Sequence, residues 1–225
     1  MRAGEGTTAP ALWSRGIERV DAVFISHPHF DHFKDILPLV DRFGIRRVFV
    51  PPTFMRKRLT VDDAVVEGLW ARGVRVEFFS AGDRLAGTGE TAVRAIWPRG
   101  PESQTREIND GSLVLDIKER GRLLLLTGDI EAAAIDALLA LEPNLKADVM
   151  LWPHHGSDPD AVGRFAQATG AKVLVVSCGL VRAKEEDPPW VAEQGIRCCR
   201  TGGDGAVTVT LEADGPAVET FVGSR

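Results

Sequence analysis

The stretch FISHPHFDHF, residues 24–33, places three histidines and an aspartate within six positions, directly after an apolar run. The residues before it, DAVFIS (21–26), have the length and composition of a buried strand. Alternate residues of an extended segment point to the same side, so His27, His29 and Asp31 can converge while His32 turns toward a neighbouring position. This donor set predicts a metal site, and its two directions predict two metal ions.

A second histidine cluster supports this interpretation. His154 and His155 lie in LWPHHGS (151–157), again after an apolar run, and all five histidines of the chain belong to the two clusters. Asp129 follows LLLLTG at the end of another predicted strand, where a carboxylate could bridge two ions. The alternative for Asp129 is a capping role at the helix expected from about Ile130.

The rest of the chain alternates apolar runs of strand length with segments of helical period, a pattern typical of a mixed α+β or α/β fold. Helices are expected over 33–43, 61–72, 131–142 and 160–170. Strands are expected over 21–26, 46–50, 74–79, 91–97, 147–153, 171–179, 196–200, 206–212 and 217–222, with a hairpin over 112–129. Because strands outnumber helices, layered sheets with helices outside them fit better than one open parallel sheet.

Composition sets the broad class. A chain of 225 residues with 44% hydrophobic and 26% charged residues predicts one globular domain, residues 1–225. The absence of a long apolar run and of a secretory signal predicts a soluble chain, and three cysteines suggest no disulfide framework. The net charge of −5 provides no general attraction to nucleic acid, so DNA binding would need a local patch such as Arg56, Lys57 and Arg58.

The pattern His27-x-His29-x-Asp31-His32, with TGD at 127–129, resembles the metallo-β-lactamase superfamily. Longer segments narrow the resemblance: SRGIERVDAVFISH, NDGSLVLDIKERGRLLLLTGDIE, ADVMLWPHHGS, AKVLVVSCG and RTGGDGAVTV. In this order they resemble the C-terminal metallo-β-lactamase-like domain of the ComEC family of competence DNA-uptake proteins, from about residue 11 onward.

This resemblance implies a four-layer αββα sandwich with two divalent ions, zinc or manganese, at one edge of the paired sheets. His27 and His29 would hold one ion and Asp31 and His32 the other, with Asp129 bridging them. His154 or His155 would complete the second site, and the sequence leaves open which. The implied activity is hydrolysis of the DNA strand that is not imported. Asp31 is expected as a ligand or as the base that orients the water, and whichever of His154 and His155 is not bound to a metal could protonate the leaving oxygen. Asp31 and His155 are the expected catalytic residues.

The first metal site departs from the superfamily pattern, because residues 33–153 contain no further histidine. Asn109 and Asp110 occupy the corresponding place, and Asp110 is a ligand candidate with a solvated turn residue as the alternative. Asn109 and Ser112 are also expected near the substrate. Gly156 and Ser157 would offer close backbone approach and a hydroxyl to a phosphate oxygen, or else form a tight turn.

The second departure is at the N-terminus, where these domains normally begin with a strand pair. We therefore expect an N-terminally truncated domain, disordered over about residues 1–10. Either an upstream chain segment or a membrane channel domain covers its exposed sheet edge, or the isolated chain is poorly stable. As part of a ComEC-like protein it would be associated with the bacterial cell membrane. The alternative functions are hydrolysis of a small ester, lactone or thioester, and an inactive remnant with an incomplete metal site.

Overall fold

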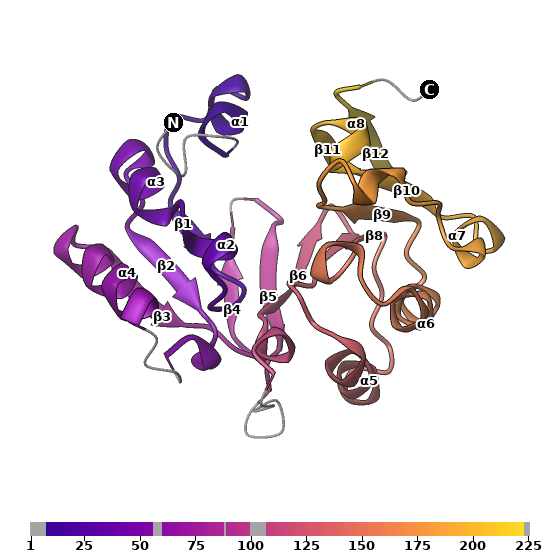
Figure 1. Cartoon of the computed structure of the whole chain (residues 1–225), viewed down its shortest axis with the longest axis horizontal. Coiled ribbons are helices and arrows are strands. Elements are labelled where there is room, and N and C mark those ends of the chain that lie inside the picture. Colours follow the sequence, from indigo (N-terminus) through magenta and orange to yellow (C-terminus); the bar gives the residue numbers. More distant parts are fainter. Residues whose placement is uncertain (1–7, 56–59, 88, 100–106, 223–225) are drawn as a thin grey trace. The chain divides into compact units, whose positions relative to one another are not determined.

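The computed structural model describes residues 8–55, 60–87, 89–99 and 107–222. Contacts gather the chain into two compact units, Met1–Ser80 and Ala81–Arg225, and each unit has its own hydrophobic core. Helices and several sheets are present in the described ranges (Figure 1), so the predicted mixed α/β class is confirmed. That the two units act as one domain stays a prediction.

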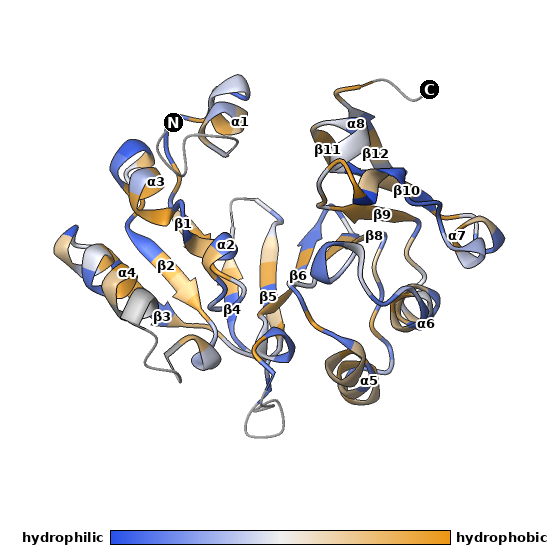
Figure 2. Ribbon diagram, in the orientation of Figure 1, coloured by the Kyte–Doolittle hydropathy of each residue, from blue (hydrophilic) through white to orange (hydrophobic). Residues whose placement is uncertain are grey.

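The first unit is built on a three-stranded parallel sheet in the order β1-β2-β3. Its elements are α1 (Thr8–Ser14), β1 (Ala22–Phe24), α2 (Phe30–Phe33), α3 (Ile36–Phe43), β2 (Arg47–Val50), η1 (Pro52–Met55), α4 (Thr60–Ala71) and β3 (Arg75–Phe78). Val48 and Val50 of β2 pack with Phe43 of α3 and Leu69 of α4 in the core of this unit. Figure 2 shows β2 changing from hydrophilic at its beginning to hydrophobic.

The opposite face of this sheet carries aromatic residues. Phe49 stacks on Phe24 with ring centroids 4.8 Å apart, and Phe79 lies 5.1 Å from Phe49. Because side chains alternate along a strand, Phe49 faces away from Val48 and Val50. The sheet is therefore apolar on both faces, as expected for parallel strands.

Two expectations for the first unit need correction. The helix predicted over 33–43 begins later, as α3 at Ile36, and α2 covers Phe30–Phe33, where the sequence predicted an extended segment. The predicted N-terminal disorder extends too far, because α1 begins at Thr8; residues 1–7 lie outside the described residues.

The second unit contains a seven-stranded sheet in the order β10-β9-β8-β7-β6-β5-β4. Its strands are β4 (Arg84–Ala86), β5 (Ala92–Trp97), β6 (Val114–Glu119), β7 (Arg122–Leu126), β8 (Val149–Leu151), β9 (Val173–Val176) and β10 (Arg197–Arg200). Strands β4 to β7 pair antiparallel and β7 to β10 pair parallel. The predicted hairpin is confirmed, and its turn uses Arg120 and Gly121 at φ 49° and 77°.

Helices connect the parallel strands of this sheet. They are α5 (Ala132–Leu141), α6 (Pro159–Thr169) and α7 (Pro189–Glu193), and the remaining elements are η3 (Asn109–Gly111), η4 (His154–Gly156), η5 (Arg182–Lys184), α8 (Thr201–Asp204), β11 (Val207–Glu212) and β12 (Gly215–Thr220). Leu125, Met150 and Leu174 pair in register across β7, β8 and β9 and belong to one core with residues of α5 and α6. Since these strands are parallel, the loops that follow β7, β8 and β9 leave the same edge of the sheet.

Within the described ranges no helix is long and apolar enough to cross a membrane.

Candidate metal centre

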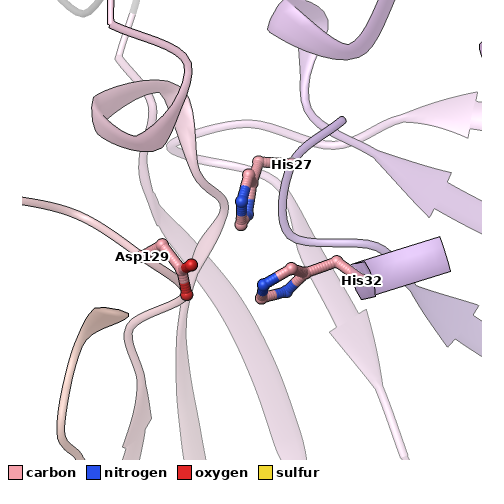
Figure 3. A group of neighbouring side chains, drawn as sticks. All are labelled: His27, His32 and Asp129. Atoms are coloured by element: carbon pink, nitrogen blue, oxygen red, sulfur yellow. The ribbon is translucent and has the colours of Figure 1, made fainter. Parts of the chain in front are cut away.

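In the first unit, the loop after β1 is organised by Ser26. Its Oγ lies 3.0 Å from Nδ1 of His27 and 3.2 Å from Nδ1 of His32. Figure 3 shows these two imidazoles side by side, with ring centroids 4.1 Å apart. Because Ser26 engages the Nδ1 atoms, both rings present Nε2 as the nitrogen for a metal.

Two donor pairs in this loop have spacings that suit a shared ion. His27 Nε2 and His29 Nδ1 are 3.0 Å apart, and His32 Nε2 and Asp31 Oδ2 are 3.6 Å apart. Two ligands of a tetrahedral zinc ion, at about 2.0–2.1 Å each, lie about 3.3 Å from one another. That His27 and His29 share one ion, and Asp31 and His32 the other, stays a prediction.

In the second unit, Asp129 lies just beyond β7, and its carboxylate is shown in Figure 3. The residue is only 5% exposed, and its backbone N–H donates to Ser112 Oγ at 3.2 Å. His155 Nε2 lies 3.6 Å from Asp129 Oδ2. The hydroxyl of Thr127 donates to the carbonyl of Leu151 at 3.0 Å, which ties together the ends of β7 and β8 that carry these two residues.

The structure distinguishes His154 from His155. His155 Nδ1 donates to the carbonyl of Ser177 at 2.9 Å, which leaves Nε2 as the basic nitrogen toward Asp129. His154 Nδ1 instead lies 3.1 Å from Glu131 Oε1. The geometry therefore favours His155 as the ligand and gives His154 a carboxylate partner.

The backbone that carries both histidines is strained. His154 and His155 have φ values of 47° and 55°, and Gly156 follows at 97°. The left-handed region is uncommon for residues other than glycine, and such conformations concentrate at functional sites. The strain is consistent with a loop that is shaped to aim these imidazoles.

Asp110 holds the start of α5. Its Oδ1 accepts the backbone N–H of Glu131 at 2.8 Å, and the backbone N–H of Ala134 also bonds to its carboxylate. Burial raises the pKa of Asp110, and Glu131 and Glu107 raise it further by their negative charges. Asp110 is thus no solvated turn residue, and it performs the helix-capping role that was the alternative for Asp129.

The residues expected near the substrate also have protein partners. Asn109 Nδ2 donates to Glu131 Oε1 at 2.8 Å, and Ser157 Oγ donates to the carbonyl of His154 at 3.0 Å. The carbonyl of Gly156 accepts a bond of 2.7 Å from Arg182 Nη1. These contacts show how the loops are held, and the substrate roles of Asn109, Ser112, Gly156 and Ser157 stay predictions. Arg56, Lys57 and Arg58 lie outside the described residues.

Three positioning residues were missed from the sequence: Ser26, Glu131 and Ser177. Ser26 precedes His27 directly, and Glu131 ends the segment GDIE, but neither position alone shows which imidazole it would contact. Ser177 acts through its backbone carbonyl, which carries no signal of residue type.

Proteins of known family are similar to this chain in sequence. The family model of the metallo-beta-lactamase superfamily matches residues 3–179. ComE operon protein 3 of Bacillus subtilis (strain 168) is 29% identical over 176 residues, which cover 78% of this chain and 22% of that protein. Competence protein ComA of Neisseria gonorrhoeae is 30% identical over 122 residues, 52% of this chain and 18% of that protein. The chain thus matches about a fifth of the length of each competence protein, and the predicted resemblance is confirmed.

Solved structures show the same fold at low identity. A Parabacteroides distasonis protein described as a metal-dependent hydrolase aligns with 82% of this chain and 77% of its own, at a TM-score of 0.53 and 13% identity. Tm1679, a metal-dependent hydrolase of the beta-lactamase superfamily, aligns with 85% of this chain and 80% of its own, at a TM-score of 0.52 and 12% identity. These neighbours share the fold, and the family match over residues 3–179 shows that the chain belongs to the metallo-β-lactamase superfamily.

Proposed function

We propose that this chain is a metal-dependent phosphodiesterase that hydrolyses single-stranded DNA with two divalent ions, zinc or manganese. The observation that carries the proposal is the pair formed by Asp129 and His155, whose Oδ2 and Nε2 are 3.6 Å apart while the imidazole is oriented by the carbonyl of Ser177. A carboxylate and a correctly oriented imidazole at the ends of neighbouring parallel strands make a donor set suited to a catalytic metal.

The ligand assignment combines donor pairs from each unit. His27 and His29 would hold one ion, Asp31, His32 and His155 the other, and Asp129 would bridge them. The spacing within each pair supports this division; that the pairs serve one dinuclear centre is proposed from the HxHxDH pattern and from membership of the superfamily. The mixture of imidazole and carboxylate donors suits zinc and also suits manganese.

Bound there, divalent ions supply Lewis acidity and a water of lowered pKa for in-line attack on a phosphodiester. The protein's own residues would orient that water and move protons. Asp31, which is exposed, can accept a hydrogen bond from the attacking water. His154, the histidine left unbound in this assignment, can protonate the leaving oxygen, and Glu131 Oε1 lies 3.1 Å from its Nδ1.

The proposal that the substrate is DNA rests on the two similar competence proteins. The names of the two similar proteins refer to competence and to the ComE operon, and this chain matches about a fifth of each. We infer that the domain acts within a DNA-uptake system at the bacterial membrane, beside an upstream chain segment or a membrane channel domain.

The test is cleavage of a labelled single-stranded oligonucleotide by the full chain, with manganese and zinc supplied separately and metal content measured on the same samples. We expect cleavage that requires metal, about two ions per chain, and loss of both metal and activity in Asp129→Ala. Hydrolysis of a p-nitrophenyl ester or a lactone without DNA cleavage would instead support a small-molecule hydrolase. A folded chain with one ion or none would contradict the dinuclear proposal.

A further inference from the structure

A pocket opens beside His155 in the second unit. It has a volume of about 340 Å³ and is lined by His155, Ser177, Cys178, Gly179 and Arg182. Its walls come from the loop that follows β9 and from η5, next to the strained turn that carries the two histidines. The volume is at the low end of the range for small-ligand sites, which is about 300–1,000 Å³.

Arg182 is the charged residue of this pocket, and its position is fixed by the neighbouring loop. Its Nη1 donates to the carbonyl of Gly156 at 2.7 Å, and the same nitrogen lies 3.5 Å from Glu185 Oε2. A methyl group at Gly156 would lie 3.0 Å from Arg182 Cδ, so the two residues are closely packed. Among the residues described, Nε and Nη2 of Arg182 make no hydrogen bond, and its side chain is 38% exposed. The guanidinium of Arg182 is therefore held in place with unused donors, and it is bonded to Gly156, the residue that follows His155.

Another part of the pocket wall is the backbone of Gly179, which has no side chain. A methyl group built on Gly179 would meet no atom within 4 Å, so this residue borders open space. The backbone N–H of Gly179 makes no hydrogen bond with any described residue. Its carbonyl is packed against Gly202, where a methyl group would come within 2.5 Å of that oxygen. The loop is thus held close to α8 while its N–H group is available to a ligand.

We propose that Arg182 and the Gly179 N–H bind a phosphate of the substrate strand that neighbours the scissile phosphodiester. A planar guanidinium with donors to spare is suited to a phosphate oxygen pair, and a backbone N–H without a partner adds a further donor. Glu185, which is 53% exposed, weakens the positive charge only in part because solvent screens it. This inference rests on the proposed function and names a substrate contact for it.

The test pairs a protein change with a substrate change. Binding of the full chain to short single-stranded oligonucleotides is measured by fluorescence anisotropy in EDTA, where no turnover occurs. One set of oligonucleotides carries a single neutral methylphosphonate, moved along the strand, and the proteins are wild type and Arg182→Met. We expect a neutral linkage at one position to weaken wild-type binding about tenfold, and Arg182→Met to bind the normal strand about tenfold more weakly.

The decisive measurement combines the Arg182→Met protein with the strand that carries the neutral linkage. If Arg182 binds that phosphate, Arg182→Met loses no further affinity when the sensitive linkage is neutral, and Arg182→Lys recovers part of the loss. A variant that merely disturbed the loop at Gly156 would keep the wild-type sensitivity to the linkage, and that outcome would overturn the inference. Equal binding of all oligonucleotides by wild type would overturn it too.

Arg164→Met is the matched control, because Arg164 lies on α6 in an exposed ion pair with Asp136 and not in the pocket. It should bind like wild type. Cleavage in the presence of metal is assayed separately. If the binding measurements give the expected result but no metal supports cleavage of the strand, the proposed function fails while the phosphate contact stands.

Discussion

At the residue scale, the two adjacent histidines have different partners. His155 is oriented by the carbonyl of Ser177 and faces Asp129, whereas His154 is bonded to Glu131. The two imidazoles can therefore be told apart by their neighbours although they share one motif.

We expect His155→Ala to lose at least one metal ion per chain and His154→Ala to keep the wild-type metal content while its turnover falls about 100-fold. Metal analysis of the folded, desalted proteins checks the first part, and the pH–rate profile checks the second. The assignment would be reversed if His154→Ala lost metal and His155→Ala retained it.

Asp110 allows a second residue-scale prediction. Its buried carboxylate bonds to the first backbone amides of α5. Asp110→Asn keeps an acceptor oxygen and should retain most of the stability, whereas Asp110→Ala should lower the free energy of unfolding by about 1–2 kcal/mol. Urea denaturation measures both. A loss of metal in a stable Asp110→Asn protein would show that Asp110 is a ligand as well as a cap.

At the element scale, the loop between β8 and α6 is shaped by glycine. Gly156 has φ 97°, and a methyl group there would meet Val176 Cγ1 at 2.9 Å and Arg182 Cδ at 3.0 Å. Gly156→Ala should lower the free energy of unfolding by about 1–3 kcal/mol, because both the backbone conformation and the space oppose it. Gly203→Ala in α8 is the control, since its methyl group would find its nearest neighbour at an ordinary 3.6 Å. Thermal unfolding compares the two, and equal melting temperatures would contradict the account.

Strands β2 and β3 are joined by an ion pair with a defined pH dependence. Arg47 Nε lies 2.8 Å from Glu77 Oε1, and this hydrogen bond is the main reason that the pKa of Glu77 is lowered. A lowered pKa in the folded state means that the stabilisation is present above the unfolded-state pKa and is lost as the pH falls through the folded-state value.

We expect Glu77→Gln to lower the free energy of unfolding by about 0.5 kcal/mol at pH 7, since the Glu77 side chain is 37% exposed and solvent screens the pair. The difference from wild type should shrink as the pH falls below the ordinary glutamate value of 4.5. Denaturant titrations at pH 7, 4.5 and 3.5 measure it. A difference that is independent of pH would indicate lost packing instead of lost charge.

At the scale of the whole molecule, the sequence predicted most strands and most helices, because periodicity and turn residues are local signals. The hairpin that ends at Asp129 is an example, since Gly121 suits the positive φ of its two-residue turn. The elements that the sequence did not predict depend on contacts between distant segments. The three-residue strand β4 is defined by its pairing with β5, and α2 forms over Phe30–Phe33, where the sequence predicted an extended segment.

The same reasoning explains the residues missed in the site. Ser26 acts on His32, six positions away, and Glu131 acts on His154, which lies across a helix and a strand. No periodicity encodes such contacts. The choice between His154 and His155 likewise required the carbonyl of Ser177, which any residue type could have supplied.

Strand β7 is the fourth of seven strands, and this central position determines the order in which the sheet of the second unit unfolds locally. Its backbone is hydrogen-bonded on both sides, antiparallel to β6 and parallel to β8, so its amides exchange with solvent only when the sheet itself comes apart. We expect hydrogen–deuterium exchange to be slowest over 123–126 and fast at the edge strand β4, and similar rates in the two strands would contradict this. Asp129, three residues beyond the end of β7, would then be attached to the last part of the sheet to open, and the carboxylate would be in place before any ion arrives.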